Sequence, residues 1–389
     1  MRFRKSMPYL IAGLFLALLL AAFFFIFNPL GLGPEPDTVL SDRFFAAPAE
    51  DLSMLELLVD GKEAFTRILS DIDSAKSSIH IQTFIWKDDT IGRSVVTRLK
   101  AVAGRDMTVT VHKDLLGTFF EIPSMLAGRP SPVFTRNGLK GHRNIDVSVG
   151  WRTDTDHSKY VITDQQRVVF GGMNIADEYH TQWHDYMVAV EDAQWTHAFK
   201  IRVLKGFPWP SEAPFFIAVN DRAATEIRTA FIEVIDRSKD RLIIEHAYFS
   251  DDRIIKAVKR AAARGVRVDV ILPKAPDTHL YANMATINRL LASKGRTSLK
   301  VFLYPKMMHA KVILADGSIA AVGSANLTLR SMLTSREVTM FVHGKPEDPL
   351  IRKLNHQLAA DLAESVPVTA PFKLSTWERL GAVVGKYVW

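Results

Sequence analysis

Two stretches of this chain carry the same reactive residue types at the same spacing. In each, a lysine follows a histidine by 2 residues, an aspartate by 7, a glycine by 14, an asparagine by 17 and a second carboxylate by 28. The first stretch contains His157, Lys159, Asp164, Gly171, Asn174 and Asp185, and the second, 152 residues later, contains His309, Lys311, Asp316, Gly323, Asn326 and Glu337. The chain therefore carries one candidate half-site twice.

These residue types suit chemistry on a phosphate. One imidazole can attack phosphorus, while a second protonates the leaving oxygen and later deprotonates an acceptor hydroxyl. Asp185 and Glu337 fit a third role, holding an imidazole N–H so that the opposite nitrogen faces the substrate. Lysine offers a point charge and asparagine an amide donor, so we expect four residues to bind phosphate: Lys159, Asn174, Lys311 and Asn326. This chemistry requires neither a metal ion nor a cofactor.

The elements around each histidine read as a β-hairpin. Short apolar runs, Tyr160 to Ile162 and Val312 to Leu314, follow the histidines, and second runs, Val168 to Phe170 and Ile319 to Val322, come after polar turns. A histidine and a lysine two residues apart on a strand share one face and can reach one ligand. Asp164 and Asp316 lie in the turns, where we expect them to brace the hairpin, although their place in the motif also makes them catalytic candidates.

The duplication extends upstream of the hairpins. Ile72 to Ile91 matches Ile235 to Ile254 at seven positions with an offset of 163 residues. With only two copies, this predicts a pseudo-twofold pair of domains that share one cleft. Two acidic pairs in these segments, Asp88-Asp89 and Asp251-Asp252, follow a strand and precede a helical pattern, which favours helix capping over paired acid catalysis.

The repeated H-x-K-x4-D pattern, each time followed by G-[GS]-x-N, resembles the signature of the phospholipase D superfamily. The flanking segments resemble its bacterial cardiolipin synthase branch over roughly residues 55 to 345: IHIQTFIWKDDTIG (79–92), GGMNIADEY (171–179), AAARGVRVDVILP (261–273) and GSANLTLRS (323–331). The resemblance implies an α/β fold, with two tandem phospholipase D-type α/β sandwich domains related by a pseudo-twofold. It also implies a phosphohistidine intermediate, with His157 as nucleophile and His309 as general acid and then base. The implied catalytic set is His157, His309, Lys159, Lys311, Asp164 and Asp316.

The chain departs from this branch at two places beside the site. It has His157-Ser158-Lys159 where the branch tends to have His-Arg-Lys, and Trp183-His184-Asp185 where the branch tends to have Trp-Arg-Asp. Each change removes an arginine, which leaves the acceptor alcohol open. His180 and His184 lie near Asp185, but no second carboxylate or cysteine completes a ligand spacing. We therefore interpret both as hydrogen-bonding histidines rather than metal ligands.

The amino terminus predicts a single transmembrane helix before the catalytic domains. Tyr9 to Phe27 is an apolar run of 19 residues, long enough to span a hydrocarbon core. Basic residues precede the run and Glu35 and Asp37 follow it, so the positive-inside rule places the catalytic body outside a bacterial cytoplasmic membrane. A signal peptide cleaved near Gly31-Leu32-Gly33 is the alternative, but the apolar run exceeds the usual length.

Composition agrees with a folded enzyme and decides little more. The 389 residues, 48% hydrophobic and 23% charged, suit two or three globular units, and the absence of cysteine excludes disulfides. The net charge of +7 suits anionic lipid and nucleic acid equally. We expect an anchor over residues 1–36, a first half over 37–214, a second half over 215–374, and a C-terminal amphipathic helix over 375–389 that begins with a Ser375–Glu378 capping box.

Two apolar segments have two interpretations each. The connector at residues 207–216 either packs against both halves or dips into a membrane. Leu115 to Leu126, in the longer first copy, either packs or places Phe119 and Phe120 at an acyl-chain entrance.

The sequence predicts a membrane-anchored phosphatidyltransferase of the cardiolipin synthase type, acting on phosphatidylglycerol. Alternatives are a hydrolytic phospholipase D and a nuclease of the same superfamily, and the anchor and the apolar insert favour lipid over nucleic acid. A non-enzymatic membrane scaffold is disfavoured because both sets of histidine, lysine and asparagine are intact. The sequence leaves the oligomeric state open.

Overall fold

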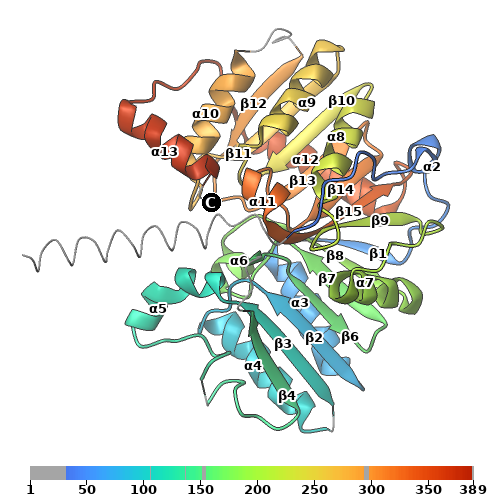
Figure 1. The fold of residues 1–389 in the computed structure, drawn as a ribbon, viewed down its shortest axis with the longest axis vertical. Helices are drawn as coiled ribbons and strands as arrows, with labels where there is room; N and C mark the ends of the chain where they lie inside the picture. The colour runs from blue at the N-terminus through green and yellow to red at the C-terminus, as the bar shows by residue number, and fades with distance from the viewer. Residues whose placement is uncertain (1–31, 106, 136, 151–154, 293–297, 388–389) are drawn as a thin grey trace, which may run out of the picture.

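Two β-sheets, one in each half of the chain, organise the protein (Figure 1). The computed structural model describes residues 32–105, 107–135, 137–150, 155–292 and 298–387. The first sheet has the strand order β1-β8-β7-β6-β2-β3-β4. The second has the order β16-β12-β11-β10-β13-β14-β15-β5, with β9 paired to β15. The predicted α/β class and the tandem repeat are confirmed.

The first half alternates strands and helices before its hairpin. After α2 (Asp42–Ala46), its strands are β1 (Leu55–Val59), β2 (Ser78–Thr83), β3 (Thr108–Asp114), β4 (Ile145–Gly150), β5 (Thr155–Asp156), β6 (Tyr160–Thr163), β7 (Arg167–Gly171) and β8 (Tyr186–Glu191). Its helices are α3 (Asp60–Ser74), α4 (Thr90–Ala103), η1 (Leu116–Glu121), α5 (Ile122–Leu126), α6 (Asp177–Thr181) and α7 (Ala193–Lys205). Strands β2, β3 and β4 run parallel, and β6 and β7 form the predicted antiparallel hairpin.

The second half repeats this order. Its strands are β9 (Phe215–Asn220), β10 (Arg241–His246), β11 (Arg267–Pro273), β12 (Leu299–Tyr304), β13 (Lys311–Ala315), β14 (Ile319–Gly323), β15 (Ser335–His343) and β16 (Val366–Pro367). Its helices are α8 (Ile227–Arg237), α9 (Asp252–Ala263), α10 (Leu280–Leu291), α11 (Leu329–Leu333), α12 (Pro349–Glu364) and α13 (Thr376–Tyr387). Strands β13 and β14 form the second predicted hairpin.

Three apolar cores lie in layers through the molecule. One lies between the first sheet and helices α3 and α4, and another lies between the second sheet and helices α8 and α9. The third lies between the sheets, where Phe170 and Phe199 of the first half belong to the same cluster as Val322 and Leu354 of the second. The two halves therefore share a buried core, and burial of apolar surface holds them in fixed relative positions.

Backbone hydrogen bonds also cross between the halves. Strand β5 pairs with the start of β15, and the backbone N–H of His157 donates to the carbonyl of Arg336 at 2.9 Å. The symmetry-related bond runs from the N–H of His309 to the carbonyl of His184 at 2.7 Å. A sequence division at residue 214/215 assigns β5 to the first half, although its hydrogen bonds extend the second sheet.

The capping predictions hold. The carboxylate of Asp89 accepts from the N–H of Gly92 at the start of α4, and that of Asp251 accepts from Ile254 at the start of α9. At α13, the N–H of Ser375 donates to Glu378 Oε2 at 2.7 Å and the N–H of Glu378 donates to Ser375 Oγ at 3.3 Å, which is the predicted capping box.

The predicted anchor, Tyr9 to Phe27, falls outside the described residues. Within the residues that the structure describes, no helix is both long enough and apolar enough to cross a membrane. The connector between the halves mainly packs, because Trp209 and Phe215 are buried and the Trp209 indole donates to the Phe215 carbonyl at 2.6 Å. Phe207, at 54%, and Pro208 are exposed.

Candidate active site

Both motif histidines line one cavity of about 560 Å³ at the junction of the halves. His157 immediately precedes the hairpin of the first half and His309 that of the second. Each histidine also has its backbone N–H bonded to a carbonyl of the opposite half. The site is therefore complete only when the two halves are docked.

Each imidazole is held by a carboxylate from the opposite half. Glu337 Oε1 and Oε2 lie 2.9 and 3.1 Å from Nδ1 of His157, and Asp185 Oδ2 lies 2.8 Å from Nδ1 of His309. Two serine hydroxyls donate to Glu337, Ser324 Oγ at 2.5 Å and Ser331 Oγ at 2.7 Å. With its Nδ1 engaged, His157 presents Nε2 to a substrate, whereas Nε2 of His309 also lies 3.3 Å from Nζ of Lys311. This is the geometry expected of histidine-orienting carboxylates.

The motif lysines lie behind the histidines and not on the cavity wall. Nζ of Lys159 donates to the carbonyl of His157, and Nζ of Lys311 donates to the carbonyl of His309 and lies 2.8 Å from its Nδ1. Both lysines are buried, and neither is among the residues that line the cavity. Their charges act on a phosphate in the cavity through space, and direct contact requires Nζ to leave the carbonyl.

The two motif asparagines line the cavity but differ in their bonding. Asn174 uses both ends of its amide, accepting from the N–H of Ile85 at 2.9 Å and donating to the Tyr179 hydroxyl at 2.9 Å. Asn326 Oδ1 is buried and has no hydrogen-bond partner among the described residues. A phosphate would need the amide N–H groups, one of which Asn174 already uses for Tyr179, and the predicted phosphate-binding role stays a prediction for both asparagines.

Asp164 and Asp316 lie away from the cavity. They follow the strands β6 and β13 at the ends remote from the histidines. The Asp164 carboxylate accepts from the backbone N–H groups of residues 76 to 78, and that of Asp316 accepts from those of residues 239 to 241. Neither aspartate lines the cavity. Their oxygens accept hydrogen bonds from backbone donors and tie each hairpin turn to the neighbouring strand, which agrees with the predicted bracing role, while a catalytic role stays a prediction.

Several cavity residues cannot be found from the repeat. The ring of Phe84 lies 4.9 Å from that of His157, and the ring of Tyr179 lies 5.1 Å from that of His309. Among the described residues that line the cavity, Arg330 alone carries a permanent positive charge, and its Nη2 donates to Thr155 Oγ1 at 2.7 Å. Tyr179 and Arg330 stand within the segments that resemble cardiolipin synthases. The 152-residue offset pairs them with residues of other types, so duplication gives no signal for them.

The apolar insert forms one wall of the cavity. Leu116, Phe119, Phe120 and Ile122 line it, while Phe119 is 60% exposed and Leu126 is 85% exposed. The insert thus spans from the cavity to the molecular surface, as an acyl-chain entrance would.

The two halves of the site differ in charge. Burial lowers the pKa of His157 to about 4 against the opposing charge of Glu337, and burial and Lys311 hold the pKa of His309 well below its usual value. Burial raises the pKa of Asp185 to about 6. Burial alone would also raise the pKa of Glu337, but His157, Lys159 and Ser324 outweigh it, and that pKa lies below the ordinary value. Glu337 is therefore a stable anion, while Asp185 and His309 share a proton more readily.

A protein-family model described as "Cardiolipin synthase, PLD-like domain" matches residues 68–202 and 231–363 of this chain. The chain belongs to this family. It is accordingly an enzyme of the phosphatidyltransferase and phosphodiesterase class. A cardiolipin synthase of Listeria monocytogenes serotype 4a is 28% identical over 368 residues, covering 85% of this chain and 74% of the relative. The major cardiolipin synthase ClsA of Bacillus subtilis is 29% identical over 331 residues, covering 76% of this chain and 66% of the relative.

Solved structures of low sequence identity share the fold of this cardiolipin synthase family member. A phosphatidylserine synthase of Haemophilus influenzae superimposes with a TM-score of 0.66 at 14% identity, covering 84% of this chain and 90% of that one. A polyphosphate kinase of Porphyromonas gingivalis gives a TM-score of 0.56 at 15% identity, covering 88% of this chain and 53% of that one. These likenesses bear on the architecture alone.

Proposed function

We propose that the protein transfers a phosphatidyl group from one phosphatidylglycerol molecule to another, forming cardiolipin and releasing glycerol. The observation that carries this proposal is the pair of imidazoles at one mostly apolar cavity, each held by a carboxylate of the opposite half. A double displacement at phosphorus needs one nucleophile and one acid–base group, and the two imidazoles supply both. The names of the Listeria and Bacillus relatives support cardiolipin as the product.

In the first step, Nε2 of His157 attacks the phosphorus of the donor lipid. A P–N bond forms, the P–O bond to the terminal glycerol breaks, and His309 gives the leaving oxygen its proton. In the second step, His309 takes the proton from a hydroxyl of the acceptor phosphatidylglycerol, whose oxygen attacks phosphorus. The P–N bond breaks, and His157 returns to its initial state with no net change in protons.

The electrostatics support His157 as the nucleophile. The phosphohistidine ring carries positive charge, and Glu337, with its lowered pKa and two serine donors, is a fixed anion beside Nδ1 of His157. Asp185, with its pKa raised to about 6, forms with His309 a pair that can hold and release a proton. A general acid needs that exchange, and a nucleophile does not.

Transfer should outcompete hydrolysis because of the cavity's lining. An acceptor alcohol held beside the base has a large effective concentration relative to diffusing water. The residues Leu116, Phe119, Phe120 and Ile122 make one wall apolar, which excludes water and suits acyl chains.

We further propose that the cavity faces a lipid surface. Exposed apolar side chains gather on η1 and α5 and again on α13: Phe119, Ile122, Met125, Leu126, Trp377, Leu380, Val383 and Val384. Both groups lie on one side of the molecule in Figure 1. Helix α13 packs on α10, which begins next to the cavity residues Thr278 and His279. An amino-terminal anchor at Tyr9 to Phe27, with the body outside a bacterial cytoplasmic membrane, is consistent with this orientation.

Product analysis with liposomes tests the proposal. The full chain is incubated with phosphatidylglycerol liposomes, and the lipid and water-soluble products are identified by mass spectrometry. Cardiolipin and glycerol in equal amounts are expected. Phosphatidic acid as the main product would reassign the protein as a hydrolytic phospholipase D. When histidine variants are compared in this assay, His180→Gln is the matched control, because His180 lies on the first-half helix α6 and does not line the cavity.

A further inference from the structure

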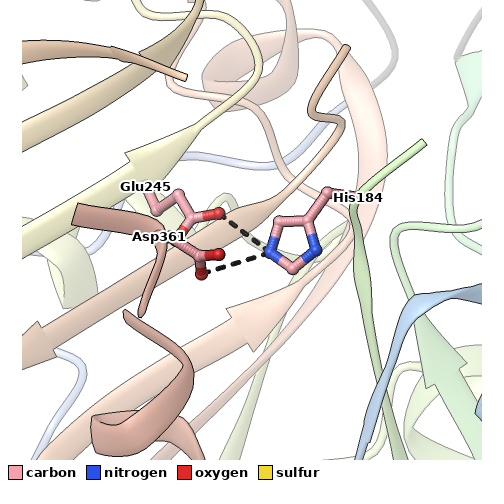
Figure 2. A group of neighbouring side chains, drawn as sticks. All are labelled: His184, Glu245 and Asp361. Carbon is pink, nitrogen blue, oxygen red and sulfur yellow. Dashed lines mark ion pairs between the residues drawn. The ribbon is translucent and has the colours of Figure 1, made fainter. Parts of the chain in front are cut away.

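A second cluster of ligand-type side chains lies outside the catalytic cavity, across the junction of the halves. His184 precedes β8, Glu245 is on β10 and Asp361 is on α12, and Figure 2 shows the imidazole facing both carboxylates. Nε2 of His184 lies 3.2 Å from Glu245 Oε1 and 3.3 Å from Asp361 Oδ2. The Tyr186 hydroxyl lies 3.0 Å from the same nitrogen and 3.1 Å from Asp361 Oδ2. All four residues are buried.

The spacing of these donors fits a metal ion. Zinc binds histidine nitrogen and carboxylate oxygen at about 2.0 to 2.2 Å in tetrahedral sites, which places neighbouring donor atoms about 3.3 Å apart. The three distances from Nε2 of His184, between 3.0 and 3.3 Å, match that separation. Glu245 Oε1 is buried, and its only contact with a polar side chain that the structure gives among the described residues is the one with Nε2 of His184. This oxygen can therefore serve as a metal ligand without giving up another partner.

The surrounding contacts match those of metal-bound histidines. Such a histidine usually donates its other ring N–H to a carboxylate. Nδ1 of His184 lies 2.7 Å from Asp60 Oδ1. The other Asp361 oxygen, Oδ1, accepts from Gln357 Nε2 at 3.0 Å, so that carboxylate is also oriented by a neighbour.

The charges around this cluster also favour a bound cation. Within the described part of the chain, no lysine or arginine forms an ion pair with Asp60, Glu245 or Asp361, and their ion pairs are with His184 alone. The position related to His184 by the 152-residue offset is Arg336, a permanent cation whose Nε lies 3.9 Å from Asp156 Oδ2. One half thus supplies a fixed positive charge at this place, and the other supplies a metal-binding side chain among three carboxylates.

We propose that His184, Glu245 and Asp361, with the Tyr186 hydroxyl as fourth donor, bind one divalent metal ion of the zinc type that joins the two halves. The ion is structural and does not take part in the proposed phosphatidyl transfer. It would still stabilise the site, because the His184 carbonyl accepts from the backbone N–H of His309.

Metal content of purified variants tests this proposal. The full chain is stripped with a chelator, incubated with zinc chloride, passed over a desalting column and measured by inductively coupled plasma mass spectrometry. We expect one zinc per chain in the wild type and in the control His180→Gln, and none in Glu245→Gln. His184→Arg also loses the zinc while supplying a fixed positive charge, so it should fold and show no zinc-dependent rise in melting temperature.

Two more variants separate this site from alternatives. Asp60→Asn removes only the carboxylate behind His184 and should weaken zinc affinity about 10- to 100-fold. Asp60 is half exposed and has a positive φ of 59°, which asparagine tolerates. His157→Ala tests zinc binding at the catalytic pair and should keep the full equivalent. A wild type that retains no zinc would overturn the proposal, as would zinc that is lost in His157→Ala and kept in Glu245→Gln.

Discussion

Replacing Glu337 by glutamine should disable the histidine of the opposite half. The side chain of Glu337 is fully buried. Its oxygens accept hydrogen bonds from Nδ1 of His157 and from the hydroxyls of Ser324 and Ser331. Glutamine has the same shape as glutamate but no charge. Its amide nitrogen would also replace one carboxylate oxygen and place a hydrogen-bond donor against the donors of the imidazole and the serines. The His157 ring becomes positive as the phosphohistidine forms, and removing one member of such a buried ion pair costs about 3 to 5 kcal/mol. If that loss falls on the transition state, kcat drops by about 10²- to 10⁴-fold.

The assay is the initial rate of cardiolipin formation from phosphatidylglycerol liposomes. Ser331→Ala is the graded control, since it removes one 2.7 Å hydrogen bond to the same carboxylate and keeps its charge. A hydrogen bond to a charged group is worth about 1.5 to 3 kcal/mol, so this variant should lose about 10- to 100-fold. A Glu337→Gln enzyme within about tenfold of the wild-type rate would refute the orienting role.

An activated substrate separates the two crossed pairs. With a phosphatidyl ester of p-nitrophenol, the leaving group needs no proton, so loss of the general acid matters little to the first step. Asp185→Asn should then release p-nitrophenol in a burst near the wild-type rate, whereas Glu337→Gln should remain slow. The reverse pattern would show that His309, and not His157, is the nucleophile.

Three other outcomes follow from the site. His157→Ala and His309→Ala should each reduce turnover of phosphatidylglycerol by more than about 10³-fold, since neither imidazole can attack and protonate at once; a loss of only about tenfold in either would indicate a single-histidine mechanism. The value of kcat/KM should fall below about pH 4, where His157 becomes protonated, and above about pH 6, where Asp185, its pKa raised by burial, loses the proton that it shares with the general acid His309; a profile that stays flat well above pH 6 would contradict that role. Asp164→Asn should lower the free energy of unfolding by on the order of 1 to 2 kcal/mol in denaturant titrations while kcat stays within twofold; a larger fall in kcat would return Asp164 to the catalytic set.

The sequence predicts the local elements of the site well because local rules determine them. The two hairpins follow from apolar runs separated by polar turns, and both are present as β6–β7 and β13–β14. The caps at Asp89, Asp251 and Ser375 follow from side-chain and backbone chemistry within one helical turn. The equal spacing of the two motifs also identifies both histidines and both orienting carboxylates.

The sequence does not predict the contacts between the two halves. The spacing predicts that Asp185 and Glu337 each orient an imidazole. That Glu337 holds His157 and Asp185 holds His309, each across the junction, depends on how the two halves dock. The same limit applies to His184, whose neighbours Glu245 and Asp361 lie far away in the chain. The sequence interprets His180 and His184 alike as hydrogen-bonding histidines, whereas in the structure the His180 ring packs edge-on against Phe65 and His184 faces two carboxylates. The lysines differ for another reason, since each ammonium donates to the backbone carbonyl of the histidine two residues before it.

The central claim is that one composite site works through a covalent intermediate on His157. To test it directly, the enzyme is mixed with phosphatidylglycerol, quenched rapidly, digested under alkaline conditions and analysed by peptide mass spectrometry. Alkaline conditions are used because a phosphoramidate bond survives base better than acid. The account predicts a phosphatidyl adduct on the peptide that contains His157, absent from His157→Ala. An adduct on His309, or steady turnover without an adduct on either histidine, would contradict it.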